Sequence, residues 1–383
     1  MAGIYVHIPF CRKACHYCDF HFSTTRDRQR EMVDAICHEL ILRKEYLAQQ
    51  AVHTLYFGGG TPSLLTADEL AALFDTIRTH FDLQADAEVT LEANPDDLSE
   101  NTLAILRQVG VNRLSIGVQS FNDAILQSFN RSHDARQAVN AIRISRAAGF
   151  ANISIDLMYA IPGLTMEQWE ETIGTAIALG PDHISAYTLT IEPRTYFGHL
   201  ASRGALVETD EETAAAQMER LVDLLAAAGF EQYEVSNFAK PGFESRHNRS
   251  YWDHRHYLGV GPGAHSYNGV TRQWNVRNNP MYLKSIGEGR VPYELETLER
   301  TDHINEYLLT SLRTTRGCDL ERLRADFEFD LAADRSAYLE RLRSLGLATL
   351  HKSTLRLTRK GRLLADKIAA DLFVSPTGDD SFS

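Results

Sequence analysis

The sequence predicts an α/β fold built on a parallel sheet, and two observations support this. Over the first 230 residues, six short β-rich runs alternate with six segments whose apolar residues recur at helical spacing. Strands that alternate with helices in this way form βαβ units, whose strands run parallel. The composition agrees, because 44% hydrophobic and 23% charged residues are ordinary for a globular protein. At roughly 100–200 residues per domain, the chain of 383 residues is expected to hold two or three domains.

The strands and helices of this first part follow one another in regular order. The predicted strands are Gly3–Ile8, Val52–Phe57, Glu88–Glu92, Arg113–Val118, Asn152–Met158 and His183–Thr190. The predicted helices span residues 28–48, 66–79, 99–108, 134–148, 165–179 and 210–228. Thr66 and Glu69 form a capping box at the start of the second helix, and glycines follow four of the helices. A barrel-like closure and an open doubly wound sheet both fit this alternation.

The alternation stops after residue 230. Gln232–Ala239 is predicted as a further strand, and residues 240–292 are rich in Gly, Pro, Asn, His and aromatic residues. That composition indicates irregular structure that covers the barrel. We therefore expect a core domain over 1–235 and an irregular covering segment over 236–295.

The last part of the chain is predicted to be mostly helical. The expected elements are helices over His303–Arg313, Asp319–Asp326 and Arg335–Leu345, a hairpin over Ala348–Leu357 and a helix over Thr358–Leu372. Helices followed by a small hairpin resemble a winged-helix module, for which a structural cap is favoured over DNA contact. We expect this domain over 296–374, followed by a polar, disordered tail over 375–383.

The charge balance limits the classes of partner. Lys and Arg number 39 against 51 Asp and Glu, a formal net charge of −12. This balance argues against nucleic acid as a general partner. No apolar run approaches the ~18–20 residues that cross a bilayer, and the first residues lack the pattern of a secretory signal. A cytoplasmic location is therefore expected.

Three of the five cysteines fall within eight residues, as the motif Cys11-x3-Cys15-x2-Cys18. An odd, clustered set does not suit a disulfide framework and indicates a metal or redox centre. Structural zinc normally needs four ligands, which His16 or His21 could complete. Three thiolates in one loop can instead hold three irons of a cubane cluster and leave the fourth iron open. The remaining two, Cys37 and Cys318, fall in predicted helical stretches and are expected to be buried apolar side chains.

Polar or glycine residues stand at the end of each early strand. The cysteines follow the first strand, Gly58–Pro62 follows the second, and Glu92 ends the third. Gln119 follows the fourth strand, and Asp156 lies in the fifth. Because the carboxyl ends of parallel strands meet at one edge of the sheet, these residues are predicted to form one site.

The cysteine motif after a first strand, with Gly-Gly-Gly-Thr-Pro after the second, resembles the radical S-adenosyl-L-methionine (SAM) superfamily. The resemblance covers about the first 240 residues. It implies a partial (βα)6 TIM-like barrel in which Cys11, Cys15 and Cys18 bind a 4Fe-4S cluster whose open iron binds SAM. Within the superfamily the opening Ile4–Cys11 resembles the oxygen-independent coproporphyrinogen III oxidases and their relatives. The resemblance then implies that SAM is bound by Tyr5, Tyr17, Gly59, Gly60, Thr61, Glu92, Gln119, Arg131 and Asp156.

Two details separate the relatives. The oxidases carry one more cysteine two places after the third, where this sequence has Phe20, and they carry an extension ahead of the first strand, on which this sequence opens directly. Arg246–Trp252 contains H-N-x-x-Y-W, which resembles the signature of the HemW heme chaperone family. This implies heme binding, with His247 as the iron ligand, and transfer of heme to an acceptor protein.

Other interpretations stay open at this point. His254, His256 and His265 lie in the same segment, and its histidines and aromatic residues could simply form a structural cover. An enzyme that decarboxylates coproporphyrinogen III is the second functional hypothesis, and a zinc-bound structural or DNA-contacting protein is the third. Whether the chain forms a homodimer, and whether its acceptor is at a membrane, is left open.

Overall fold

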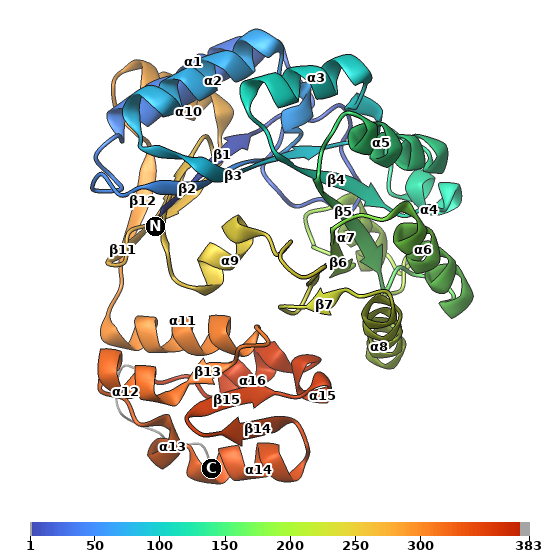
Figure 1. The fold of residues 1–383 in the computed structure, drawn as a ribbon, viewed down its shortest axis with the longest axis vertical. Coiled ribbons are helices and arrows are strands. Elements are labelled where there is room, and N and C mark those ends of the chain that lie inside the picture. Colours follow the sequence, from blue (N-terminus) through green and yellow to red (C-terminus); the bar gives the residue numbers. More distant parts are fainter. Residues whose placement is uncertain (1, 376–383) are drawn as a thin grey trace.

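Six parallel strands form the centre of the main sheet, and they lie there in the same order as in the chain (Figure 1). The computed structural model describes residues 2–375. The six strands are β1 (Ala2–Ile8), β2 (Val52–Gly59), β3 (Leu83–Ala93), β4 (Arg113–Gln119), β5 (Asn152–Tyr159) and β6 (His183–Thr188). Because their order never reverses, the sheet is a partial barrel and not a doubly wound sheet. The predicted barrel is confirmed.

Helices cover the outer face of this sheet (Figure 1). They are α1 (Gln29–Leu42), α2 (Ala67–His80), α3 (Glu100–Val109), α5 (Ala135–Ala147), α6 (Met166–Leu179) and α8 (Glu211–Ala227). The alternation of side chains along β1 divides the two faces. Ile4, Val6 and Ile8 are buried in the core against the helices, whereas Tyr5 and His7 line a cavity on the inner face.

Most predicted boundaries are close to those observed, and the capping box of Thr66 and Glu69 is present. The first helix ends at Leu42 and not at residue 48, because turns follow it in which Ala48 and Gln49 have positive φ. Two short helices, α4 (Asp123–Ser128) and α7 (Tyr196–Ser202), were not predicted. Each has at most seven residues, too few to establish an apolar period.

The predicted irregular structure over 236–295 is wrong, because this segment extends the sheet at both ends. Its elements are β8 (Asn237–Ala239), α9 (Arg246–Trp252), β9 (His256–Val260), β10 (His265–Tyr267), β11 (Thr271–Asn275), α10 (Asn279–Gly287) and β12 (Tyr293–Thr297). Strand β9 pairs in parallel with β1, and β10, β11 and β12 continue the sheet antiparallel. The single strand predicted over Gln232–Ala239 is instead β7 (Glu231–Gln232) and β8, joined by a turn.

The C-terminal unit has a hydrophobic core of its own. It contains α11 (Arg300–Leu312), β13 (Cys318–Asp319), α12 (Leu320–Phe327), α13 (Leu331–Asp334), α14 (Ser336–Ser344), β14 (Ala348–His351), β15 (Thr354–Leu357), α15 (Arg359–Arg362) and α16 (Ala365–Asp371). Three strands pair in the order β13-β15-β14, which with the helices makes the winged-helix-like arrangement that was predicted.

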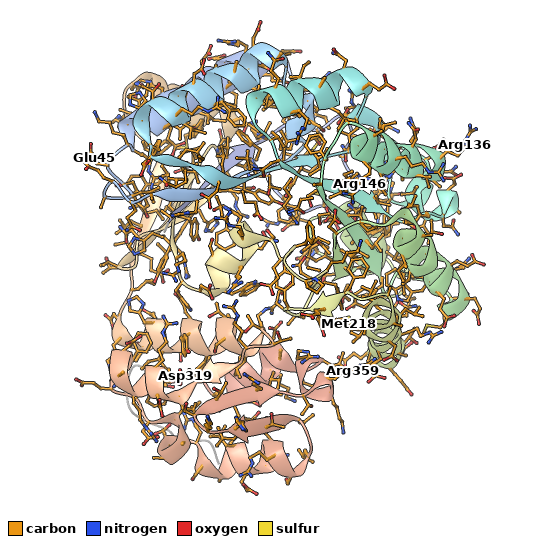
Figure 2. The ribbon with its side chains drawn as sticks, in the orientation of Figure 1. Glu45, Arg136, Arg146, Met218, Asp319 and Arg359 are labelled. Carbon is orange, nitrogen blue, oxygen red and sulfur yellow. The ribbon has the colours of Figure 1, made fainter. Side chains whose placement is uncertain are left out.

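Two details of the C-terminal prediction were wrong. Cys318 lies in the short strand β13 and not in a helix, although it is buried as expected. The final predicted helix is divided into α15 and α16. Arg359, at the start of α15, donates to Asp223 of α8 and so connects this unit to the barrel (Figure 2). The predicted disordered tail lies, from residue 376 onward, outside the described residues.

Candidate functional site

One cavity of about 630 Å³ lies at the carboxyl ends of the parallel strands. Its lining includes eleven of the thirteen residues predicted from the sequence. These are Cys11, Cys15, Cys18, Tyr17, Gly59, Gly60, Thr61, Glu92, Gln119, Arg131 and Asp156. We call this space the first cavity. The edge of the sheet therefore gathers these polar side chains, as the strand-end argument predicted.

The three cysteines occupy a loop that returns to its starting point. The N–H of Cys11 donates to the carbonyl of Ser23 at 3.0 Å, and the N–H of Ser23 donates to Pro9 at 2.8 Å. Burial raises the pKa of Cys11 to about 12 and that of Cys18 to about 11. The thiols of Cys11 and Cys18 are therefore protonated at neutral pH unless a bound metal displaces the protons.

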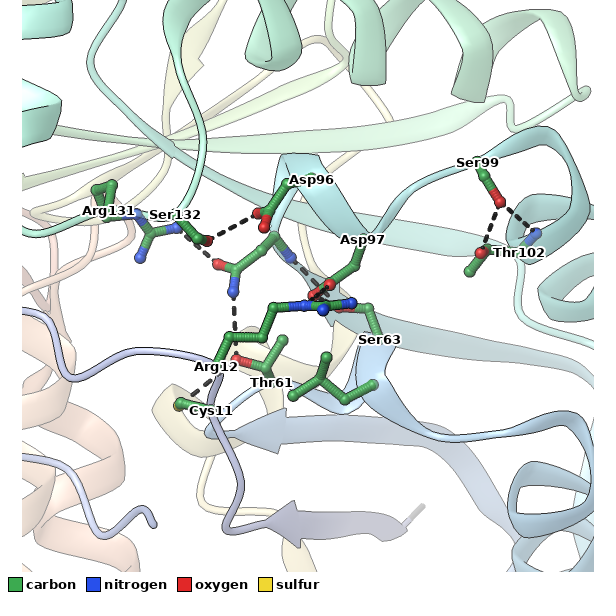
Figure 3. Close-up of polar contacts among 12 residues, drawn as sticks. Cys11, Arg12, Thr61, Ser63, Asp96, Asp97, Ser99, Thr102, Arg131 and Ser132 are labelled. Atoms are coloured by element: carbon green, nitrogen blue, oxygen red, sulfur yellow. Dashed lines mark hydrogen bonds and ion pairs between the residues drawn. The ribbon is translucent and has the colours of Figure 1, made fainter. Parts of the chain in front are cut away.

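Two side chains donate toward the sulfur atoms. Thr61 Oγ1 lies 3.5 Å from Cys11 Sγ (Figure 3). Arg131 Nη1 lies 3.3 Å from Cys15 Sγ. Arg131 Nη2 also donates to Asn94 Oδ1 at 2.6 Å and to the carbonyl of Gly117 at 2.8 Å. The guanidinium is thus held in place beside the thiols, where its charge would stabilise thiolates.

The histidines near the cysteine loop are not placed to complete a zinc site with the thiols. Within residues 2–375, no three His, Cys, Asp or Glu side chains come close enough to hold one metal ion. The two histidines that could have completed such a site have other partners. His16 Nδ1 lies 2.7 Å from the carbonyl of Ser128, and His21 Nε2 lies 2.7 Å from Asn279 Oδ1. Neither histidine is therefore free to complete a zinc site in this conformation.

The glycine strip after β2 brings backbone to the cysteine loop. A Cβ on Gly60 would lie 2.6 Å from the carbonyl oxygen of Phe10, and Gly59 has a φ of +105°. Both positions therefore require glycine. The strip can approach a ligand with its backbone, without side chains between.

Two half-buried carboxyl groups line the first cavity, Glu92 from β3 and Asp156 from β5, the strands on either side of β4. Glu92 accepts from the hydroxyl of Tyr56 at 2.7 Å and from the N–H of Gly59 at 3.2 Å. Burial raises the pKa of Glu92 to about 7 and that of Asp156 to about 6. Each group can therefore change protonation when a cation binds beside it.

The cavity also contains residues that the sequence analysis did not select. They include Asn94, Ser115, Tyr187, Thr188 and Glu192. Ser115 lies inside β4, where its position along the strand gave no signal. Asn94 directly follows β3, so its place at a strand end was a usable signal. Tyr187, Thr188 and Glu192 follow the same rule at the end of β6.

Tyr5 and His247, the other two predicted residues, do not line the first cavity. His247 in α9 is buried, and both ring nitrogens have partners: Nδ1 lies 2.8 Å from Thr54 Oγ1 and Nε2 2.8 Å from Tyr251 Oη. Burial lowers the pKa of His247 to about 3, so the ring is neutral. Glu88 positions the helix by accepting the N–H groups of Arg246 and His247, each at 2.9 Å.

A second cavity, also of about 630 Å³, lies between the open side of the barrel and α11. Tyr5, Tyr251, Tyr257, His254, His265 and Arg255 are among its lining residues. Asp19, Phe20 and Arg277 line both this second cavity and the first. The two spaces are therefore neighbours that share one rim.

Comparison with known proteins agrees with this architecture. Residues 5–176 match the family model of the radical SAM superfamily, and residues 298–364 match that of the HemN C-terminal domain. The chain is 38% identical to the heme chaperone HemW of Bacillus subtilis over 372 residues, covering 96% of this chain and 98% of the relative. The chain belongs to the HemW family of radical SAM proteins.

A second HemW protein is similar to this chain to the same degree. The heme chaperone HemW of Escherichia coli is 38% identical, over 81% of this chain and 82% of its own length. Coproporphyrinogen III oxidase (HemN) from Escherichia coli, described as a radical SAM enzyme, superposes with a TM-score of 0.84. It is 26% identical, over 97% of this chain and 90% of its own. The HemW family thus shares its fold with an oxidase, and the fold alone does not separate the two functions.

Among the described helices, none is both long and apolar enough to span a bilayer.

Proposed function

We propose that this protein is a heme chaperone that binds heme and transfers it to an acceptor protein. The observation that supports this most directly is the 38% identity to a heme chaperone over 98% of that relative's length. Phe20 and the H-N-x-x-Y-W motif at Arg246–Trp252 point the same way. They are the two sequence details that separate this chain from the oxidases.

We further propose that the first cavity holds a 4Fe-4S cluster with SAM at its open iron. The donor set fits, since three thiols from one loop meet a cavity that also offers a fixed cation, two carboxyl groups and bare backbone. Cys11, Cys15 and Cys18 would bind the cluster. Tyr17, Gly59, Gly60, Thr61, Glu92, Gln119, Arg131 and Asp156 would surround SAM. The cluster would supply an electron to SAM, and its role here would be structural or regulatory, controlling dimerisation or heme release.

Anaerobic reconstitution tests the cluster. The wild-type protein is expected to take up about four irons per chain and to show the visible absorption of an iron–sulfur cluster. Cys15→Ser is expected to lose most of this absorption. Cys37→Ser is the matched control, because Cys37 lies in α1 away from the cavity, and it should keep the full spectrum. Uptake of zinc alone by the wild type would contradict the proposal.

His247 stays the proposed iron ligand for heme, on the family pattern. Tyr251 would have to release His247 Nε2 before that nitrogen could bind iron, because the hydroxyl holds it at 2.8 Å. His265 is the alternative. It is exposed, lies in the second cavity and stacks on Trp274, and among the described residues its ring nitrogens have no hydrogen-bond partner.

A heme titration followed by the Soret band separates these cases. We expect saturable binding by the wild type and a shifted, weakened band for His247→Ala. Loss of binding in His265→Ala with normal binding in His247→Ala would assign the ligand to His265. No saturable binding by the wild type would contradict the chaperone proposal itself.

The second candidate function, oxidation of coproporphyrinogen III, is favoured by the likeness to HemN. Turnover of coproporphyrinogen III to protoporphyrinogen IX with consumption of SAM would establish it. We expect none, because Phe20 replaces the extra cysteine of the oxidases.

We make five further proposals about this protein. They are a cytoplasmic location, no nucleic-acid partner, the division of the chain at residues 235 and 296, a homodimer, and membrane contact through the acceptor alone. The mass of the reconstituted protein in solution tests the homodimer, since a monomeric mass with and without the cluster would contradict it.

A further inference from the structure

The second cavity carries unpaired positive charge in a molecule that is acidic overall. Three arginines and two carboxylates line it. Both carboxylates form ion pairs, but only one of the three arginines does. Arg272 pairs with Glu306, and Asp19 pairs with Arg194 outside the cavity at 3.0 Å. Arg255 and Arg277 make no side-chain hydrogen bond or ion pair with any residue between 2 and 375. Their charge is therefore available to an anion.

Two histidines of the cavity, His7 and His254, do not add to this charge. Burial lowers the pKa of His7 and of His254 to about 4, and that of His265 is also lowered. The two free guanidinium groups supply unpaired positive charge, and each can bind a carboxylate through two N–H donors.

Aromatic rings form the walls of the same cavity. Tyr251 and Tyr257 pack edge to face with centroids 4.7 Å apart, and Tyr267 lies 6.4 Å from Tyr257. Phe20 stands at the rim shared with the first cavity and is 74% exposed, which is unusual for so large an apolar side chain. Aromatic walls with two unpaired cations among the lining residues suit a flat aromatic ligand that carries carboxylates.

We propose that the second cavity is the porphyrin site, with the propionate carboxylates of heme bound by Arg255 and Arg277. This inference rests on the proposed heme-chaperone function and gives that function its location. It also connects the site to α9, because Tyr251 both lines the cavity and holds His247 Nε2. The motif histidine thus stands one side chain behind the cavity wall.

Esterified heme provides the test, because iron protoporphyrin IX dimethyl ester keeps the ring and the iron but lacks the carboxylate charges. We expect the wild type to bind heme about tenfold or more tightly than the diester. The double variant Arg255→Gln, Arg277→Gln should bind both with the same, weaker affinity. Arg255→Gln alone should lose part of the preference while SAM binding is unchanged, since Arg255 does not line the first cavity.

The control is Arg136→Gln, since Arg136 is an exposed arginine of α5 on the far side of the molecule (Figure 2). It should keep the wild-type preference. The proposal is overturned if the wild type binds heme and the diester equally, or if the double variant keeps the preference with an unchanged circular dichroism spectrum. In those outcomes heme still binds, so the chaperone function survives. Binding of neither ligand by the wild type would contradict both the porphyrin site and the heme-chaperone function.

Discussion

At the scale of single residues, Glu92 is a carboxyl group that the barrel holds in a fixed position at the first cavity. Its carboxyl group is held by Tyr56 and by the backbone of Gly59, and Tyr56 stacks on His247 with centroids 5.0 Å apart. A short chain of contacts therefore runs from the first cavity to the wall of the second.

Glu92→Gln is expected to stabilise the protein without cofactors at high pH. The pKa of Glu92 rises on folding from 4.5 to about 7, so the unfolded chain ionises first and folding becomes less favourable as pH rises through this window. The variant should be more stable than wild type by about 2 kcal/mol near pH 8 and by little near pH 4.5. Thermal unfolding at both pH values measures the difference, and an equal gain of stability at both would contradict a raised pKa of Glu92 as its cause.

The same variant should bind SAM more weakly if Glu92 faces a bound cation, because glutamine carries no charge. Isothermal titration of the reconstituted protein with SAM measures the change. An unchanged affinity would show that the Glu92 carboxylate makes no charge-dependent contact with SAM.

At the scale of elements, β9 matters most, because it extends the barrel strands and contributes to the wall of the second cavity. It pairs with β1, more than 250 residues earlier in the chain, through positions such as Ile4 opposite Leu258. Gly259 allows β10 to lie close to β9, because a Cβ at this position would lie 2.0 Å from the carbonyl oxygen of His265. The close pairing of β9 and β10 at this wall therefore requires that residue 259 has no side chain.

Gly259→Ala is expected to destabilise the protein by about 1–3 kcal/mol, because the added methyl group displaces β10. Gly174→Ala is the matched control. Gly174 lies in α6 with no atom within 4 Å of the added Cβ, so the change should stabilise by about 0.5–1 kcal/mol. Chemical denaturation measures both. Equal effects of the two substitutions would contradict the close approach of β9 and β10.

At the scale of the whole molecule, two hydrophobic cores are joined by a polar boundary. His254 meets Thr310 at 2.8 Å, Arg316 meets Asp253 at 3.2 Å, and the N–H of Thr315 donates to Tyr233 at 3.1 Å. Contacts of this kind hold two units with less free energy than a shared core does. Helix α11 stands at this boundary and forms one wall of the second cavity.

Leu355→Ala should therefore loosen the C-terminal unit and leave the barrel intact. Leu355 is fully buried in the second core, so the truncation is expected to cost about 2–5 kcal/mol there. Hydrogen exchange followed by mass spectrometry should speed up in peptides from 300–372 and stay unchanged in β1–β6. Leu350→Ala, at an exposed position of β14, is the control. Faster exchange throughout the barrel would show that the molecule unfolds as one unit.

The sequence by itself determined what is local along the chain. The alternation of apolar runs predicted β1–β6 and their helices, and the positions of strand ends predicted that the cysteines, Glu92, Gln119 and Asp156 share one cavity. Tyr17 and Arg131 followed only from the family resemblance. Only the tertiary structure decided the rest. Strand β9 is defined by its pairing with β1, which leaves no local period, and Tyr5 and His247 lie at and behind the wall of the second cavity because α9 packs against the barrel strands there. The choice among the histidines was likewise beyond the sequence, because it depends on which ring nitrogens the folded chain has already bonded.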